Sequence, residues 1–169
     1  TLTTCDDDYD GVSTFDLTVS EFEILDIRSN GIAVTYFESL ETLESNTNTI
    51  ANPETYNNIA NPQTVYVKVE NTLSGCYVSI PLELEVNLPP TINNIPSIEI
   101  CDNAVDTYNL NDATQILFSN TVNTLITYHL NLLDAQNNQN NLLNTYNYTS
   151  ANQTLYVRAE NTNTNCVAI

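Results

Sequence analysis

Residues 61–72 read Asn-Pro-Gln-Thr-Val-Tyr-Val-Lys-Val-Glu-Asn-Thr, and they return 90 residues later, at 151–162, as Ala-Asn-Gln-Thr-Leu-Tyr-Val-Arg-Ala-Glu-Asn-Thr. Cys76 and Cys166 share this offset, and Val-Thr-Tyr at 34–36 returns as Ile-Thr-Tyr at 126–128. Self-similarity at a fixed spacing is typical of tandem domains. A Pro89-Pro90 pair makes a stiff, extended joint. We therefore expect one domain over 1–88 and a second over 89–169.

The second copy is shorter than the first. Copy 1 continues through residues 80–87 after its second cysteine, whereas copy 2 stops at Ile169 before the equivalent segment. We expect the second domain to be C-terminally incomplete, and the chain to be a piece of a longer series of repeats.

Within each copy, apolar residues alternate with polar ones, which indicates β-strands. Val65, Val67 and Val69 face one way in the strand predicted at 64–70, and Tyr66, Lys68 and Glu70 face the other. Lys68 and Arg158 occupy equivalent outward positions, where we expect cross-strand ion pairs. Strands are also predicted at 32–37 and at 76–86, the latter with five candidate buried residues: Tyr77, Ile80, Leu82, Leu84 and Val86.

Short helical turns interrupt these strands. A capping-box pattern starts at Ser20, a second turn is expected over 39–44, and a third over 113–118 with Asn111 or Asp112 as its cap. The many short strands predict an all-β chain of two tandem immunoglobulin-like β-sandwich domains with short helical turns.

The four cysteines have similar spacings in the two copies, 71 residues from Cys5 to Cys76 and 65 from Cys101 to Cys166. We predict that these two pairs form disulfides, so that each domain is closed by one bond and the protein resides in an oxidising, extracytoplasmic compartment. Four reduced, buried cysteines in a cytosolic protein are the alternative. The sequence has no CxxC pattern, so zinc binding is not expected.

The net charge of -18, with only three basic residues, repels phosphate backbones and excludes nucleic acid as a partner. No apolar run approaches the roughly 20 residues of a membrane span, so we expect no direct membrane insertion.

Residues 5–12, Cys-Asp-Asp-Asp-Tyr-Asp-Gly-Val, contain D-x-D-x-D-G, the first half of an EF-hand-type calcium loop. Carboxylates at alternate positions converge on an ion, glycine allows the sharp turn, and the next residue offers its carbonyl. We predict one structural Ca²⁺ held by Asp6, Asp8, Asp10, Val12 and Asp16. A solvated acidic turn is the alternative, and copy 2, which lacks the glycine and two of the acids, is not expected to bind.

Catalysis is not expected. The single histidine, His129, takes the place of Phe37 in copy 1, which favours a packed strand position.

Three segments, residues 5–18, 32–50 and 61–87, resemble the tandem immunoglobulin-like repeats of large secreted surface adhesins of flavobacteria and related Bacteroidota. The specific parts are the Cys-Asp-rich-Gly start and the strand that leads through Thr-Val-Tyr-Val-Lys-Val-Glu-Asn to a cysteine. The resemblance implies export by type IX secretion, association with gliding motility, and an extracellular location at the outer-membrane surface.

Two functions follow as expectations. The first is a non-enzymatic adhesin or stalk module, stiffened by disulfides and calcium, whose partners are neighbouring repeats and surface glycans or other polymers. The second is a carbohydrate-binding module that uses Tyr66 and Tyr156, which recur at equivalent positions.

Overall fold

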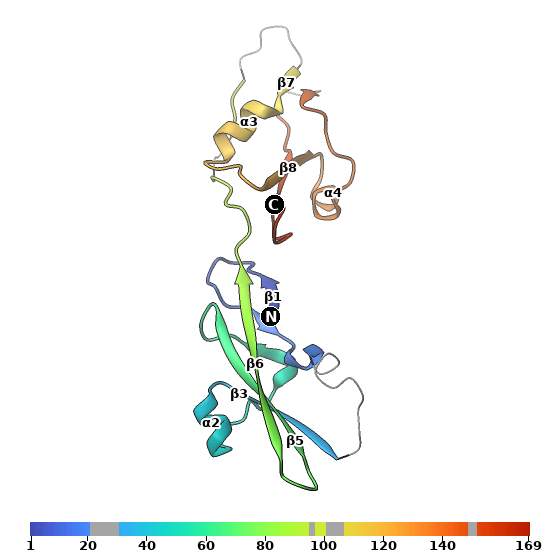
Figure 1. The fold of residues 1–169 in the computed structure, drawn as a ribbon. Helices are drawn as coiled ribbons and strands as arrows, with labels where there is room; N and C mark the ends of the chain where they lie inside the picture. Colours follow the sequence, from blue (N-terminus) through green and yellow to red (C-terminus); the bar gives the residue numbers. More distant parts are fainter. Residues whose placement is uncertain (21–30, 95–96, 101–106, 149–151) are drawn as a thin grey trace. The chain divides into compact units, whose positions relative to one another are not determined.

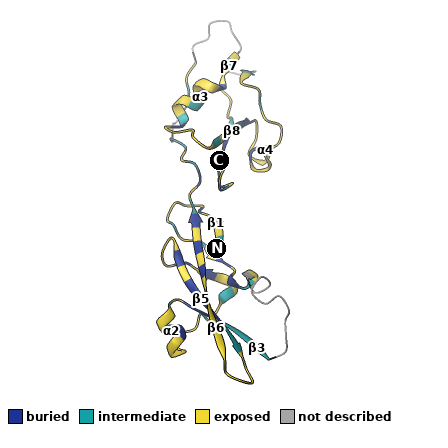
Figure 2. Ribbon diagram, viewed as in Figure 1, coloured by how far each residue is buried: buried dark blue, intermediate teal, exposed yellow. Residues whose placement is uncertain are grey.

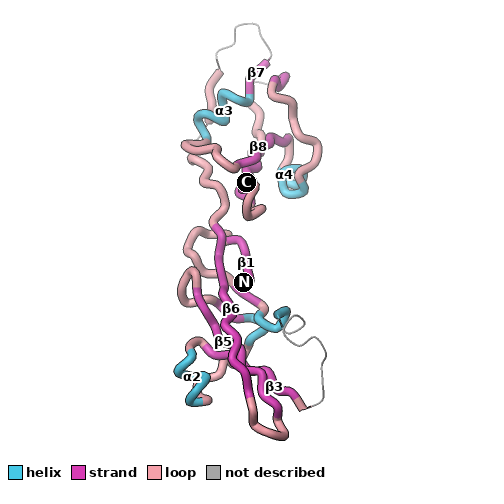
Figure 3. Tube along the Cα trace, viewed as in Figure 1, coloured by secondary structure: helices cyan, strands magenta, loops and turns pink. Residues whose placement is uncertain are grey.

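The computed structural model describes residues 1–20, 31–94, 97–100, 107–148 and 152–169. The chain divides into two compact units, Thr1–Leu88 and Pro89–Ile169, with the boundary at the Pro89-Pro90 pair. Strands predominate and the helices are short (Figure 3).

The first unit is built on a four-stranded sheet in the order β1-β6-β5-β3 (Figure 1). Its strands are β1 (Leu2–Cys5), β3 (Ile32–Phe37), β5 (Gln63–Asn71) and β6 (Tyr77–Asn87). β5 pairs antiparallel with both β3 and β6, whereas β1 runs parallel to the last part of β6, from Leu84 to Asn87. The strands predicted at 32–37, 64–70 and 76–86 are confirmed, and each observed end lies within one residue of the predicted one.

A second, two-stranded sheet joins β2 (Thr14–Phe15) to β4 (Tyr56–Asn57). Among the described residues of this unit there are three short helices: η1 (Leu17–Ser20), α2 (Leu40–Ser45) and η2 (Pro53–Thr55). The core draws on both sheets: Phe15, Leu17, Tyr36, Tyr56, Val65, Val67, Leu82, Leu84 and Val86. Buried and exposed residues alternate along β6 (Figure 2), as its sequence period predicts, although Tyr77 is exposed and Ile80 only partly buried.

The second unit contains a three-stranded sheet, β11-β10-β8, and a two-stranded sheet, β7-β9. Its elements are β7 (Thr107–Asn109), α3 (Leu110–Leu117), β8 (Thr124–His129), α4 (Leu132–Asn137), β9 (Thr145–Asn147), β10 (Tyr156–Asn161) and β11 (Val167–Ala168). Leu110, Ala113 and Tyr128 form the centre of its core.

The repeat seen in the sequence is also a repeat of structure. α2 and α4 are each six residues long, and each ends at an asparagine with positive φ, Asn46 at 53° and Asn138 at 52°. Asparagine tolerates this left-handed conformation better than most residues, so both helices end at an asparagine C-cap in equivalent positions of the two copies. Phe37 and His129 are equivalent and completely buried.

The predicted helical turns have different outcomes. The turn expected over 39–44 is confirmed as α2, with Ser39 as its N-cap. The third turn is α3, but its cap is Asn109, whose side chain accepts a hydrogen bond from the backbone N–H of Asn111. The capping box expected after Ser20 lies outside the described residues.

The predicted disulfide pairing is wrong. Cys5 and Cys166 are both disulfide-bonded, whereas Cys76 carries a free thiol. A bond from either residue to Cys101, which lies outside the described residues, would leave the other without a partner, so Cys5 and Cys166 are bonded to each other. The bond joins the two repeats, and neither domain is closed by a disulfide of its own.

The reason is the direction of β1. Cys5 is opposite Asn87 at one end of β6, and Cys76 immediately precedes the other end. Ten residue steps at roughly 3.3 Å place the two ends about 33 Å apart. Bridged cysteines have Cα atoms no more than about 7 Å apart, so Cys5 and Cys76 cannot pair within one domain.

Candidate metal loop and the cysteine positions

The acidic loop begins where β1 ends. The backbone N–H of Asp6 donates to the carbonyl of Asn87 at 2.9 Å, which continues the pairing with β6 for one more residue. The side chain of Asp6 is buried and turns back into the loop. It accepts hydrogen bonds from the N–H groups of Asp8 (3.0 Å), Tyr9 (2.7 Å) and Gly11 (2.7 Å). The loop therefore wraps around one carboxylate.

The exposed side chains of Asp8 and Asp10 also accept hydrogen bonds from the backbone of the loop. Asp8 accepts from the N–H of Asp10 at 3.2 Å, and Asp10 accepts from the N–H of Val12 at 2.6 Å. Such links from an aspartate to the backbone two residues ahead are Asx-turns. Gly11, with φ of 77°, supplies the left-handed conformation that the sequence pattern assigns to it.

The environments of Asp6 and Asp8 move their pKa values in opposite directions. Burial raises the pKa of Asp6, but the backbone hydrogen bonds from Gly11, Asp8 and Tyr9 outweigh it, and the net pKa lies below its ordinary value. The backbone hydrogen bond from Asp10 lowers the pKa of Asp8, whereas desolvation and the charges of Asp10 and Asp6 raise it to a net value above the ordinary one. A bound cation would offset the repulsion between the Asp8 carboxylate and the charges of Asp10 and Asp6.

Asp6, Asp7 and Asp8 form an acidic group that could hold a metal ion, with one carboxylate oxygen from each lying within 4.8 Å of the others. Of the predicted ligands, Asp6 and Asp8 are therefore brought together, and Asp7 joins them. Asp10 is not part of this group. Asp16 accepts from the N–H and hydroxyl of Thr18, at 2.9 and 2.6 Å, where η1 begins.

Asn58 holds the far side of the loop, a role that was not predicted. Its buried amide donates to the carbonyls of Gly11 and Ala60, both at 2.9 Å, and its oxygen accepts from the N–H of Ser13 at 2.7 Å. The difference between the two copies at this position could have pointed to the role of Asn58. Copy 2, which lacks the acidic loop, has Tyr148 at the equivalent position.

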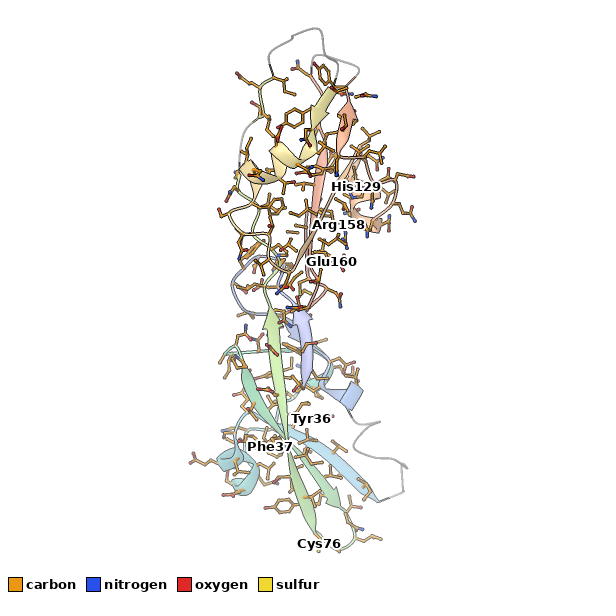
Figure 4. The ribbon with its side chains drawn as sticks, turned by 45° about the horizontal axis from the view of Figure 1, so that its top comes forward. Tyr36, Phe37, Cys76, His129, Arg158 and Glu160 are labelled. Carbon is orange, nitrogen blue, oxygen red and sulfur yellow. The ribbon has the colours of Figure 1, made fainter. Side chains whose placement is uncertain are left out.

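Lys68 and Arg158 are buried, contrary to the prediction that they face outward. α2 contacts β5 and α4 contacts β10, so a short helix covers each of these strands. Lys68 pairs with Glu70 at 2.5 Å and Arg158 with Glu160 at 2.5 Å (Figure 4), within one strand rather than across strands. Lys68 also donates to the side-chain oxygen of Asn46 at the end of α2.

The remaining candidate residues lie within the sheets. Tyr66 pairs with Phe37 on β3, and Tyr156 pairs with His129 on β8. Both tyrosines are partly buried. The two nitrogens of His129 lie 2.8 Å from the Gln139 carbonyl and 2.9 Å from the Thr127 hydroxyl, as suits a packed strand position.

The Flavobacterium inter-domain disulphide bond domain family matches the chain twice, over residues 1–90 and 97–169, and the chain belongs to this family. No curated protein and no solved structure matches it. Among the helices of the described residues, none is long and apolar enough to cross a lipid bilayer.

Proposed function

We propose that the chain is a pair of non-enzymatic structural modules from an extracellular surface protein, acting as part of a stalk or adhesin. The observation that carries the proposal is the bond from Cys5 to Cys166, which links one repeat to the next. Disulfides persist in oxidising compartments outside the cytoplasm. The Flavobacterium family and the resemblance to surface adhesins support the same location.

The position of the bond suits a chain under tension. All residues between Cys5 and Cys166 lie inside one covalent loop, so a force applied at residues 1 and 169 passes through the disulfide. Both cores are then spared from mechanical unfolding. A cross-link within each domain would protect only that domain, whereas this bond protects both units and their joint.

We also infer that each unit is a reduced immunoglobulin-like sandwich. In such folds, strands C, F and G share one sheet and strands B and E belong to the other. The order β6-β5-β3 corresponds to G-F-C, and the pair β2-β4 corresponds to B-E. β1 then takes the place of a first strand that pairs in parallel with the last.

Calcium is the ion that the acidic loop fits best. The loop offers only oxygen ligands, which Ca²⁺ prefers, and extracellular modules bind it at about 10⁻⁴ to 10⁻³ M. Isothermal titration of the metal-free chain should show one site in this range. No heat of binding at millimolar Ca²⁺ would refute this part of the proposal.

The location can be tested on intact source cells. Brief treatment with an external protease should release peptides of this chain, while peptides of cytoplasmic proteins stay protected. If the chain's peptides appear only after the cells are lysed, the surface assignment is wrong.

A further inference from the structure

Lys68 is the only lysine in the chain, and its ammonium group lies beside the end of α2. Its backbone pairs with Thr35 on β3 and with Ser79 on β6, so strands on both sides fix its position. Only 10% of its side-chain surface is exposed. Lysine is rarely buried to this extent unless its charge has a specific partner. The amine is therefore held among fixed neighbours.

These neighbours include an amide, a carboxylate and an aromatic ring. Nζ donates a hydrogen bond to the side-chain oxygen of Asn46 at 3.2 Å and pairs with the Glu70 carboxylate at 2.5 Å. It also lies 4.8 Å from the centre of the Tyr77 ring. Asn46 is the C-cap of α2, and its backbone N–H donates to the carbonyls of Leu43 and Thr42. A primary amine and a carboxylate from β5 thus meet a carboxamide that is fixed at the end of a helix.

We propose that Lys68 and Asn46 react to form an isopeptide bond, with Glu70 as the catalytic carboxylate. The amine is a nucleophile once it loses a proton, and the carboxamide is the acyl group that it attacks. The carboxylate that takes up the proton already contacts the amine. Both other groups therefore touch Nζ before any bond forms. The cross-link is independent of the disulfide and goes beyond the proposed function.

The amine is close enough to attack the amide carbon. A carbonyl bond is about 1.23 Å long, so the Cγ atom of Asn46 lies at most about 4.4 Å from Nζ of Lys68. Attack requires roughly 3–3.5 Å, which a small rotation of the carboxamide supplies. Held reactants can behave as though one were present at an effective concentration of about 10⁵ M or more. The fold therefore supplies the proximity that a slow amide exchange needs.

The step releases ammonia and needs no oxidant. Glu70 takes one proton from the ammonium, and the freed lone pair of Nζ attacks Cγ of Asn46. The bond from Cγ to Nδ2 then breaks, and the leaving nitrogen takes the second proton of Nζ and the proton held by Glu70. One ammonium group and one carboxamide become one secondary amide and one ammonium ion, and the carboxylate is regenerated. Because Asn46 is exposed, the leaving group passes directly to solvent.

Copy 2 has the same framework without the nucleophile. Asn138 ends α4 with a φ of 52°, and Glu160 pairs with Arg158 on β10 (Figure 4). The guanidinium of Arg158 stays protonated and offers no lone pair for the attack. We therefore expect the bond in the first repeat alone. Lys68→Arg, which introduces the residue found in copy 2, is the matched control.

The test combines the intact mass of the full chain with its cleavage by trypsin. The purified chain is kept for several days at neutral pH, reduced, denatured and digested. Trypsin cuts after a free lysine but not after an acylated one, so the chain should be cut after Arg28 and Arg158 but not after Lys68. We expect an intact mass lower than the sequence mass by one ammonia, and an uncut peptide 29–158. The Lys68→Arg chain should keep its full mass and be cut at residue 68.

A second protease locates the bond. Cleavage after glutamate should yield residues 45–54 joined to residues 55–70, with the mass of one ammonia missing. Full mass together with a cut after Lys68 would overturn the proposal. A missing ammonia together with a cut after Lys68 would overturn it as well, because a succinimide at an asparagine also loses ammonia but leaves the lysine free.

Two further variants test the roles of the neighbours. Asn46→Ala should keep the full mass and restore cleavage after Lys68. Glu70→Gln preserves the shape of the side chain but cannot take up the proton, so the bonded fraction of freshly purified protein should fall by about tenfold or more. Glu85→Gln, on the exposed side of β6, is its control and should leave this fraction unchanged. Equal bonded fractions in the two glutamine variants would overturn the catalytic role of Glu70.

Discussion

Cys5 lies opposite Asn87 at the end of β6 that leads into the joint between the units, while Cys76 lies beyond the other end of the same strand. The first unit therefore holds its two cysteines at opposite ends of one strand, too far apart to form a disulfide within the unit. This explains why a domain with a small core can have two cysteines and still form no disulfide within itself.

Extension under force should depend on the disulfide. With handles at residues 1 and 169, the oxidised chain has only seven extensible residues outside the covalent loop, and it should lengthen by about 25 Å. The Lys68→Arg chain, which cannot form the proposed isopeptide bond, should reach about 600 Å in reductant. Single-molecule force spectroscopy measures both lengths. If the oxidised chain also reached the full length, no disulfide would close the covalent loop between Cys5 and Cys166.

The disulfide should also raise the free energy of unfolding of the chain. It closes a loop of about 160 residues, for which the chain-entropy model gives roughly 5 kcal/mol. Cys166→Ser should therefore lower the free energy of unfolding by up to this amount in denaturant titrations. Cys76→Ser, which removes a free exposed thiol, is the matched control and should change it by less than about 0.5 kcal/mol.

Asn58 should matter for stability as well as for the loop. Asn58→Ala leaves the N–H of Ser13 and the carbonyls of Gly11 and Ala60 without their partner, at a cost of about 2–3 kcal/mol. Asn57→Ala, at the exposed neighbouring position, should have a much smaller effect. Equal losses from the two variants in urea unfolding would contradict the role assigned to Asn58.

Asp6 should stabilise the fold except in acid. Because its pKa in the folded chain lies below the ordinary value of 3.8, its contribution is present above that pH and is lost as the pH falls through the folded pKa. Asp6→Asn should lower the melting temperature at neutral pH and flatten the decline in acid. An unchanged acid limb would show that Asp6 is not the group that titrates.

Asp8→Asn should separate stability from metal binding. Since the pKa of Asp8 is raised, its charge is unfavourable in the metal-free fold, and its removal should raise the melting temperature measured with a chelator. The same change removes a ligand charge and should weaken Ca²⁺ binding by about tenfold or more. Glu85→Gln, on the exposed side of β6, should change neither quantity.

The local parts of the structure were predictable from the sequence, and the long-range parts were not. The alternation around Val65 and Val67 specifies a strand, and Ser39 marks the start of α2, because both signals act over a few residues. The cysteine spacings give loop lengths but not the end of the domain at which each thiol lies. That depends on the parallel pairing of Leu2 with Leu84, which joins segments 82 residues apart.

The acidic loop shows the same division. The alternation of Asp6, Asp8 and Asp10 before Gly11 predicts a tight turn lined with oxygens. The sequence distance to Asp16 suggests a further ligand, and in the structure the Oδ1 atom of Asp16 accepts a hydrogen bond from the backbone N–H of Thr18 in η1. Asn58 follows β4 and lies more than 40 residues from the loop in sequence, and only the comparison with Tyr148 in copy 2 points to its contribution.

Peptide mapping of the unreduced protein tests the central claim most directly. After alkylation of free thiols and proteolysis without reductant, mass spectrometry should find the peptide containing Cys5 linked to the peptide containing Cys166, with Cys76 alkylated. A link from Cys5 to Cys76 would show that the first domain closes on itself, and it would contradict the proposed connection between repeats.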